Sequence, residues 1–163
     1  MKPQNDVRLS LLEMYAAGPD KLEVFIKGLP EDSLSIHPGG GEWSIREIIH
    51  HIVDGDDIWN TCIKAAMGNQ DGEFTLQWYW DLPQITWSKN WKYGTRSIIN
   101  SLALFRANRA HIVELLRLSP DTWDCAIAIH WPGDKGLSKV SIEDVVRMHV
   151  DHLNGHLEDM SGI

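Results

Sequence analysis

Three histidines with helical spacing stand near the end of the chain: His149, His152 and His156. Imidazole nitrogens bind zinc, nickel, copper and iron. Because His152 and His156 are four residues apart, both rings can reach one ion if the segment is helical. The histidine pair of the zinc metalloprotease motif has the same spacing, although the glutamate of that motif is absent here. The cluster therefore predicts a metal site on a helix.

The surrounding residues have the period of an amphipathic helix. With Ile142 at the centre of the apolar stripe, His149 and His156 lie within about 40° of it and His152 within about 80°. All three rings therefore project from the side that faces the core. Several ring nitrogens without partners are costly in an apolar core, and a shared metal ion removes that cost.

A second pair, His50 and His51, follows another apolar stripe that starts at Ile45. His51 lies about 120° from the centre of that stripe, and His50 lies about 140° away on the opposite flank. Only one of the two rings can face a given neighbouring helix, and the periodicity favours His51 slightly. A third imidazole from this helix would complete a three-histidine site with one open position, which is typical of catalytic sites.

Asp56 and Arg109 are predicted to face the core from two different helices. Asp56 lies within about 20° of the centre of its stripe, and Arg109 lies about 20° from Ile98 in its own. A buried carboxylate needs a partner. Either Asp56 pairs with Arg109 as a structural ion pair, or it orients a metal-bound histidine or water. The remaining histidines, His37, His111 and His130, are expected at the surface, although His37 and His130 could rim a site.

Four helical stretches must position these residues. Gly18-Pro19 interrupts the first, so one kinked helix or two pieces would fit it, and the sequences SIRE and SIED are capping boxes that start the second and the fourth. The expected bounds are about Asp6–Lys27, from the Ser44 cap to about Met67, about Trp91–Leu118, and from the Ser141 cap to about Asp159. The chain is therefore expected to form a single all-α domain over residues 1–163, a four-helix bundle with functional side chains inside.

The longest connection, residues 68–91, is rich in aromatic residues and has no clear helical period. Long connections in small domains are often lids or binding loops, so residues 74–91 would shape an apolar pocket above the metal. The alternative is that the aromatic side chains plug one end of the bundle or form a dimer contact. Between residues 120 and 140, only residues 126–129 could form a short extended piece.

Composition excludes several classes of protein. Lys and Arg total 15 against 23 Asp and Glu, so the net charge of −8 disfavours binding to nucleic acid or to an anionic membrane surface. No apolar run approaches the roughly 20 residues of a membrane helix, and the first residues lack the apolar core of a signal peptide. A cytoplasmic protein is expected, with Cys62 and Cys125 reduced and buried as small hydrophobic residues.

Two of these motifs together resemble the DinB-like superfamily, in particular its YfiT-like metal-dependent branch. Residues 41–54, GEWSIREIIHHIVD, resemble the family's stretch G-x-W-[ST]-[IV]-R-[EQ]-[IV]-[IV]-x-H-[LVI]-x-D, and residues 152–156 are similar to its closing H-x-x-x-H. The resemblance implies an up-down-down-up four-helix bundle, often a homodimer. It also implies that His51, His152 and His156 bind a divalent ion, which agrees with the periodicity. His149 departs from the pattern and could be a fourth ligand, a proton shuttle or a group that orients a ligand.

The resemblance also implies a function. Some relatives transfer low-molecular-weight thiols such as bacillithiol or mycothiol to electrophiles, and others are described as metal-dependent hydrolases. We therefore expect a metalloenzyme, with zinc or nickel as the ion, that activates a small thiol or water for transfer to an electrophile or for hydrolysis of a small-molecule substrate. The alternatives are a non-catalytic, stress-related homodimer that binds metal, and a metal-free bundle with hydrogen-bonded histidines.

Overall fold

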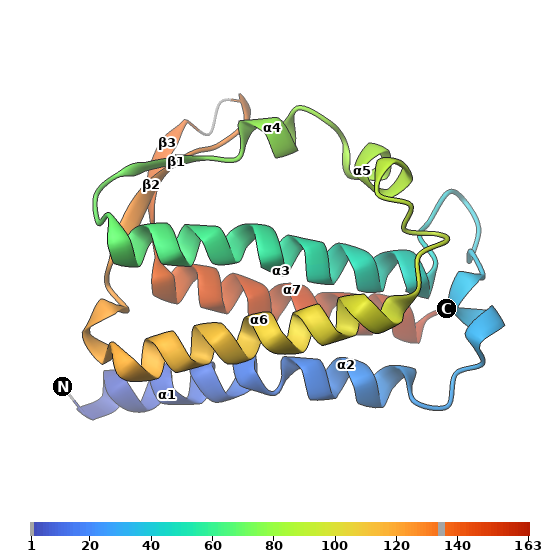
Figure 1. The fold of residues 1–163 in the computed structure, drawn as a ribbon, viewed down its shortest axis with the longest axis horizontal. Helices are drawn as coiled ribbons and strands as arrows, with labels where there is room; N and C mark the ends of the chain where they lie inside the picture. The colour runs from blue at the N-terminus through green and yellow to red at the C-terminus, as the bar shows by residue number, and fades with distance from the viewer. Residues whose placement is uncertain (1, 134–135) are drawn as a thin grey trace.

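The computed structural model describes residues 2–133 and 136–163, and in them the main helices lie side by side as four rods (Figure 1). The first rod consists of two helices in line, α1 (Lys2–Ala16) and α2 (Gly18–Ile26), which are separated where Pro19 enters the first turn of α2. Of the two alternatives for this stretch, the structure therefore has two pieces. The other rods are α3 (Ile45–Gly68), α6 (Ile98–Leu118) and α7 (Ile142–Ser161).

Capping boxes fix the starts of α3 and α7. The Ser44 backbone N–H donates to the Glu47 carboxylate at 3.0 Å, and the Glu47 N–H donates to Ser44 Oγ. Ser141 and Asp144 make the same reciprocal pair, with the Ser141 N–H donating to Asp144 Oδ2 at 2.9 Å. Each box satisfies backbone donors that the first helical turn leaves free. The starts of these two helices are therefore fixed locally.

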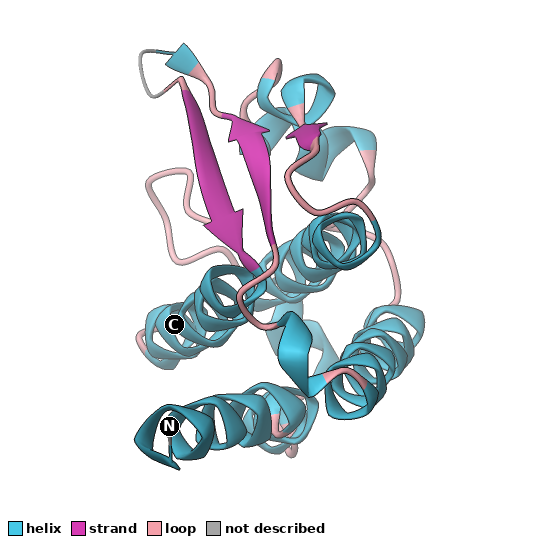
Figure 2. Ribbon diagram, turned by 90° about the vertical axis from the view of Figure 1, so that its left-hand side faces the viewer, coloured by secondary structure: helices cyan, strands magenta, loops and turns pink. Residues whose placement is uncertain are grey.

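A small sheet corrects the expectation of an all-α chain. Its strands are β1 (Glu73–Thr75), β2 (Ala126–His130) and β3 (Leu137–Ser141). Strand β2 is central: β1 pairs with it in parallel, with Glu73 opposite Ala128, and β3 pairs with it antiparallel, with Ala126 opposite Ser141. Figure 2 shows the sheet beside the helices rather than between them. The short apolar run at residues 126–129 indicated one extended piece, but its partners are too short or too polar to be predicted.

The long connection between α3 and α6 is also more ordered than expected. After β1 it forms two short helices, α4 (Gln77–Trp80) and α5 (Gln84–Asn90), which lie over α3 with the sheet (Figure 1). Helix α6 begins at Ile98, whereas the sequence predicted a start near Trp91. Lys92 takes a left-handed conformation, with φ 59°, and the Ser97 side chain accepts from the Ile99 N–H as the cap. Short 3-10 turns occur at Glu31–Ser35 and Pro120–Thr122.

The core consists of two apolar clusters along the bundle. Leu11, Tyr15, Ile63, Ile112 and Val146 are among the buried members of one, and Leu22, Ile49, Ile52, Phe105 and Leu153 are among those of the other. Helix α3 packs against both α6 and α7, so its side chains reach both neighbours. Among the described residues, no helix combines the length and the apolar character needed to cross a membrane.

Candidate metal centre

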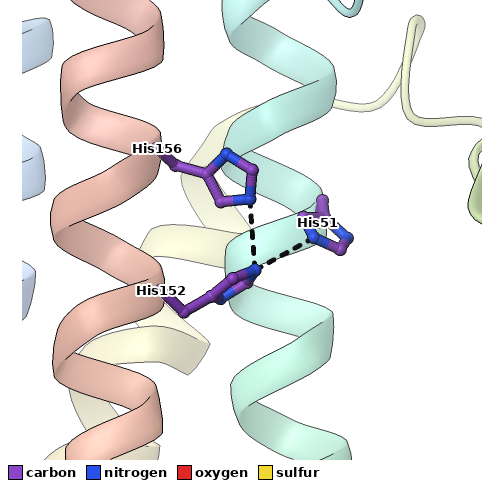
Figure 3. A group of neighbouring side chains, drawn as sticks. All are labelled: His51, His152 and His156. Atoms are coloured by element: carbon purple, nitrogen blue, oxygen red, sulfur yellow. Dashed lines mark hydrogen bonds between the residues drawn. The ribbon is translucent and has the colours of Figure 1, made fainter.

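Three imidazole rings from two helices meet at the boundary between α3 and α7. His51 comes from α3, and His152 and His156 come from successive turns of α7 (Figure 3). The His152 Nε2 atom lies 3.1 Å from His51 Nε2 and 3.1 Å from His156 Nε2. One ligand atom from each residue lies within 4.8 Å of the other two. The three residues are therefore placed where one ion could contact them all.

His50 and His51 face different helices, as their positions on opposite flanks of α3 require. His50 is fully buried toward α6, where its Nδ1 lies 2.9 Å from Ser101 Oγ and its Nε2 lies 3.2 Å from the carbonyl oxygen of Arg96. His51 instead faces α7 and packs against the edge of the Trp43 ring. Both nitrogens of His50 therefore have protein partners, and His51 is the ring left for the cluster.

Hydrogen bonds among the three rings cannot satisfy all three Nε2 atoms. A single imidazole nitrogen either carries a proton or offers one lone pair. His152 Nε2 therefore cannot accept from one neighbour and donate to the other. In a tetrahedral site with metal–nitrogen bonds of about 2.0–2.1 Å, the ligand nitrogens lie about 3.3 Å apart. The two separations of 3.1 Å are close to that value, so these residues fit a divalent ion.

The surroundings of His51 and His152 keep both imidazole rings unprotonated, so that each can offer a nitrogen lone pair to a metal ion. Burial, followed by the neighbouring rings of His152 and His156, lowers the pKa of His51 to about 3. Burial, followed by His156 and His149, lowers the pKa of His152 to about 4. Both rings are therefore neutral at neutral pH, which is the form that binds metals.

A carboxylate orients the third ring. His156 Nδ1 lies 3.1 Å from Asp159 Oδ2, so Nδ1 carries the proton and Nε2 keeps its lone pair toward the cluster. Asp159 was not among the residues expected at the site. Its spacing of three residues from His156 on one helix is the signal that could have identified it.

Asp56, Arg109 and His149 lie next to the three histidines. Arg109 Nε and Nη2 donate to the two carboxylate oxygens of Asp56 at 2.9 and 3.0 Å, and both side chains are almost completely buried. Arg109 Nη1 also donates to the carbonyl oxygen of Tyr15. Of the two alternatives for Asp56, the structure shows the ion pair with Arg109. Asp56 also approaches a histidine, with its Oδ1 atom 3.5 Å from His149 Nδ1.

A cavity of about 210 Å³ adjoins the cluster on the side of His51 and His152. Its wall consists of Gly55 and Trp59 from α3, Tyr79 and Gln84 from the long connection, and Met148 and His149 from α7, together with the two cluster histidines. The aromatic connection therefore contributes Tyr79 to this wall. Its tryptophans do not line the cavity but pack against residues that do. Trp80 packs against Trp59 and stacks on Trp131, and Trp78, Trp87 and Trp91 pack against Tyr79.

The other predicted residues lie away from the cluster or at its margin. His37, His111 and His130 are exposed; His37 contacts the Glu42 carbonyl oxygen, and His130 contacts the Glu73 carboxylate. Cys62 is buried, and burial raises the pKa of its thiol to about 12, so it behaves as a small apolar residue. Cys125 is half-buried.

Comparison with known proteins places the chain in a family. A model of the DinB superfamily matches residues 14–160. The fold is similar to that of YfiT from Bacillus subtilis, described as a probable metal-dependent hydrolase with an unusual four-helix bundle topology. The TM-score is 0.80 at 18% identity, and the match covers 99% of this chain and 86% of that one. No curated protein sequence gives a significant match. The resemblance seen in the sequence is thereby confirmed: the chain belongs to the DinB superfamily.

Proposed function

We propose that this protein is a metal-dependent enzyme in which His51, His152 and His156 hold one divalent ion. The observation that carries the proposal is the convergence of three Nε2 atoms on one point, with His152 Nε2 3.1 Å from each of the others. Imidazole ligands suit zinc and nickel, and these are the ions that we propose. The description of YfiT as a metal-dependent hydrolase supports the same class of site.

The ligand set favours catalysis over a purely structural role for the ion. Three protein ligands leave a tetrahedral ion with an open position, whereas structural sites are filled by four. The cavity beside His51 and His152 has room for a small molecule next to these two rings. When bound, the ion would supply Lewis-acid chemistry by lowering the pKa of a water or thiol that it contacts. The protein residues hold the rings, and the Asp159 carboxylate holds the proton on His156 Nδ1.

The reaction that we propose is attack of an activated water, or of a small thiol, on an electrophilic carbon. Water as the nucleophile gives hydrolysis of an ester or amide, and a thiol gives transfer of that thiol to an electrophile. A panel of activated esters and amides, and thiol consumption with a reactive electrophile, distinguishes the two reactions. If the metal-loaded protein turns over no member of a broad panel, the non-catalytic alternative, a metal-binding protein, replaces the enzyme.

Metal content tests the ligand assignment directly. We expect His51→Ala and His152→Ala to lower the bound metal, measured by inductively coupled plasma mass spectrometry, at least tenfold after dialysis. His111→Ala is the matched control because His111 is exposed and distant in sequence from the three ligands. Full metal content in either of the first two variants would show that the assignment is wrong. Light scattering on the same samples tests the homodimer that the family resemblance implies.

A further inference from the structure

Gly55 lies in the interior of α3, where glycine is less favourable than alanine. Its backbone does not require glycine, because it is helical and its φ is not positive. Close packing does not require glycine either. Apart from its own helix, a Cβ added at position 55 would meet only His152 Cε1 within 4 Å, at 3.8 Å, which is an ordinary van der Waals contact. The absence of a side chain at this position therefore calls for another explanation.

The cavity beside the histidine cluster supplies that explanation. His51, Gly55 and Trp59 are spaced by four residues, so they lie on one face of α3, and all three are part of the cavity wall. His152 of α7, the ring that a Cβ at position 55 would touch, belongs to the same wall. A methyl group at position 55 would therefore stand between the side chains of His51 and Trp59 and fill part of the cavity.

The wall has no formally charged partner for a ligand. Among the described residues of the wall, none is Lys, Arg, Asp or Glu, and Trp59, Tyr79 and Met148 supply aromatic and thioether surface. The Tyr79 hydroxyl is occupied, since it donates to Gln84 Oε1 at 2.9 Å. A charged group that entered the cavity would lose its water without gaining a partner of opposite charge from the wall, which is unfavourable.

The size of the cavity limits what it can hold. Its volume is about 210 Å³. An apolar cavity of about 150 Å³ is large enough for benzene, whereas pockets for drug-sized ligands have roughly 300–1,000 Å³. The cavity therefore has room for one small ring or a short branched chain.

We infer that this cavity holds an uncharged, apolar group of the substrate, up to the size of a phenyl ring, and that Gly55 sets the size of that group. The inference rests on the proposed function, because it names the class of substrate for the same histidine cluster. Gly55 is then a specificity-determining residue: any side chain at this position would select for a smaller group, since hydrophobic pockets distinguish ligands that differ by a single methylene.

Fluorobenzene tests the cavity without relying on catalysis. Because this probe does not bind metals, its affinity is measured by fluorine-19 NMR with and without zinc. The backbone amide resonance of Gly55 should shift on binding, which locates the probe in the unaltered protein. In metal-stripped protein, 4-fluorobenzoate should bind at least about tenfold more weakly than fluorobenzene, because its carboxylate would be buried without a partner.

Gly55→Ala tests the role of the glycine. The variant should fold, since the new Cβ makes only an ordinary contact. We expect it to bind fluorobenzene at least about fivefold more weakly, because the added methyl group overpacks the occupied cavity. Gly155→Ala is the matched control: Gly155 is exposed in the middle of α7, and a Cβ there meets nothing within 4 Å. This control should bind fluorobenzene as the unaltered protein does.

Two hydroxamates, which bind metal ions, connect the cavity with the proposed ion. On zinc-loaded protein, benzohydroxamate should bind about tenfold more tightly than acetohydroxamate, because its phenyl ring is buried in the cavity. Gly55→Ala should weaken benzohydroxamate and leave acetohydroxamate within about twofold, since a methyl group still fits beside alanine. Isothermal titration calorimetry measures all four affinities.

The outcomes separate this inference from the metal proposal. Unchanged binding of fluorobenzene or benzohydroxamate in Gly55→Ala, equal binding of the two hydroxamates to the unaltered protein, or 4-fluorobenzoate binding as tightly as fluorobenzene would each overturn the inference. If zinc-loaded protein binds neither hydroxamate, the proposed metal site is wrong, and the substrate assignment fails with it. The fluorobenzene titrations then still decide whether Gly55 sets the size of the cavity.

Discussion

At the scale of single residues, the buried pair of Asp56 and Arg109 links several helices beside the histidine cluster. Arg109 is fully buried, with its guanidinium over the rings of Tyr15 and Phe105 at 4.4 and 4.5 Å. Its donors reach Asp56, the Tyr15 carbonyl oxygen and the His149 carbonyl oxygen. The pair therefore ties α1, α3, α6 and α7 together at one point beside the histidine cluster.

Asp56→Asn should destabilise the protein severely. The change leaves the Arg109 charge buried without its counter-ion, and breaking such a pair costs about 3–5 kcal/mol. For a chain of this length, that loss lowers the melting temperature by on the order of 10 °C. Thermal unfolding followed by circular dichroism measures the effect.

A double variant shows whether the loss comes from the unpaired charge. Asp56→Leu combined with Arg109→Met removes both charges and keeps apolar volume, so it should be more stable than Asp56→Asn alone. The double variant should still be less stable than the unaltered protein, because the carbonyl oxygens of Tyr15 and His149 also lose their Arg109 donors. A double variant less stable than Asp56→Asn would show that the polar contacts of Arg109 matter more than the charge balance.

Periodicity places residues on faces of a helix, and this explains what was predictable at this scale. It put Asp56 and Arg109 inside, and the structure shows their ion pair. It favoured His51 over His50 only slightly, because the two rings lie on opposite flanks of α3. The choice depends on which neighbour lies on which side, and Ser101 of α6 binds His50. The unsatisfied nitrogens of His149 depend on distances between helices, which a single sequence does not contain.

At the scale of the helices, two glycines should respond oppositely to the same substitution. Gly155 lies in the middle of α7, exposed, and a Cβ added there meets nothing within 4 Å. Gly155→Ala should therefore stabilise the protein by about 0.5–1 kcal/mol, the difference in helix propensity. Urea unfolding at neutral pH measures the change in the free energy of unfolding.

Gly18→Ala should destabilise the protein. At Gly18, a Cβ would lie 2.1 Å from Arg109 Nη1. That atom cannot move away freely because it donates to the carbonyl oxygen of Tyr15. Overpacking of this kind costs about 1–3 kcal/mol. Equal effects of Gly18→Ala and Gly155→Ala on stability would show that Arg109 can shift to make room for a methyl group at position 18.

The starts of helices were predictable where a local signal fixes them. Both capping boxes predicted the start of a helix correctly, because Ser44 with Glu47 and Ser141 with Asp144 act within one turn. The start of α6 was placed seven residues early, since its single cap, Ser97, has no partner three residues on. The sheet was missed because β1 and β2 are far apart in sequence, and only their pairing stabilises such short strands.

At the scale of the whole molecule, the fold opposes the protonation of several histidines at once. Burial is the largest cause of a lowered pKa for His50, His51, His149 and His152. In the unfolded chain these groups return to the ordinary histidine value of about 6.5. The folded and unfolded states therefore bind different numbers of protons below that pH, and stability must depend on pH.

The metal-free protein should lose stability as the pH falls from 7.5 to 5.5. In this range the unfolded chain takes up protons near pH 6.5, whereas the folded chain resists protonation until about pH 4 at His152 and about pH 3 at His51. The unfolded state binds more protons, so the free energy of unfolding decreases with falling pH. Most carboxylates titrate at lower pH, so the change in the free energy of unfolding between pH 7.5 and 5.5 comes mainly from the histidines.

Urea midpoints measured in the presence of a chelator at several pH values give the slope. His152→Gln removes one histidine whose pKa is lowered by burial and should reduce the slope. His111→Gln, which changes an exposed histidine, is the matched control. Adding zinc at neutral pH should raise the midpoint, because an ion that binds only the folded state stabilises it. A midpoint that does not change between pH 7.5 and 5.5 would mean that the buried rings accept protons in the folded state, which the packing around His51 and His149 argues against.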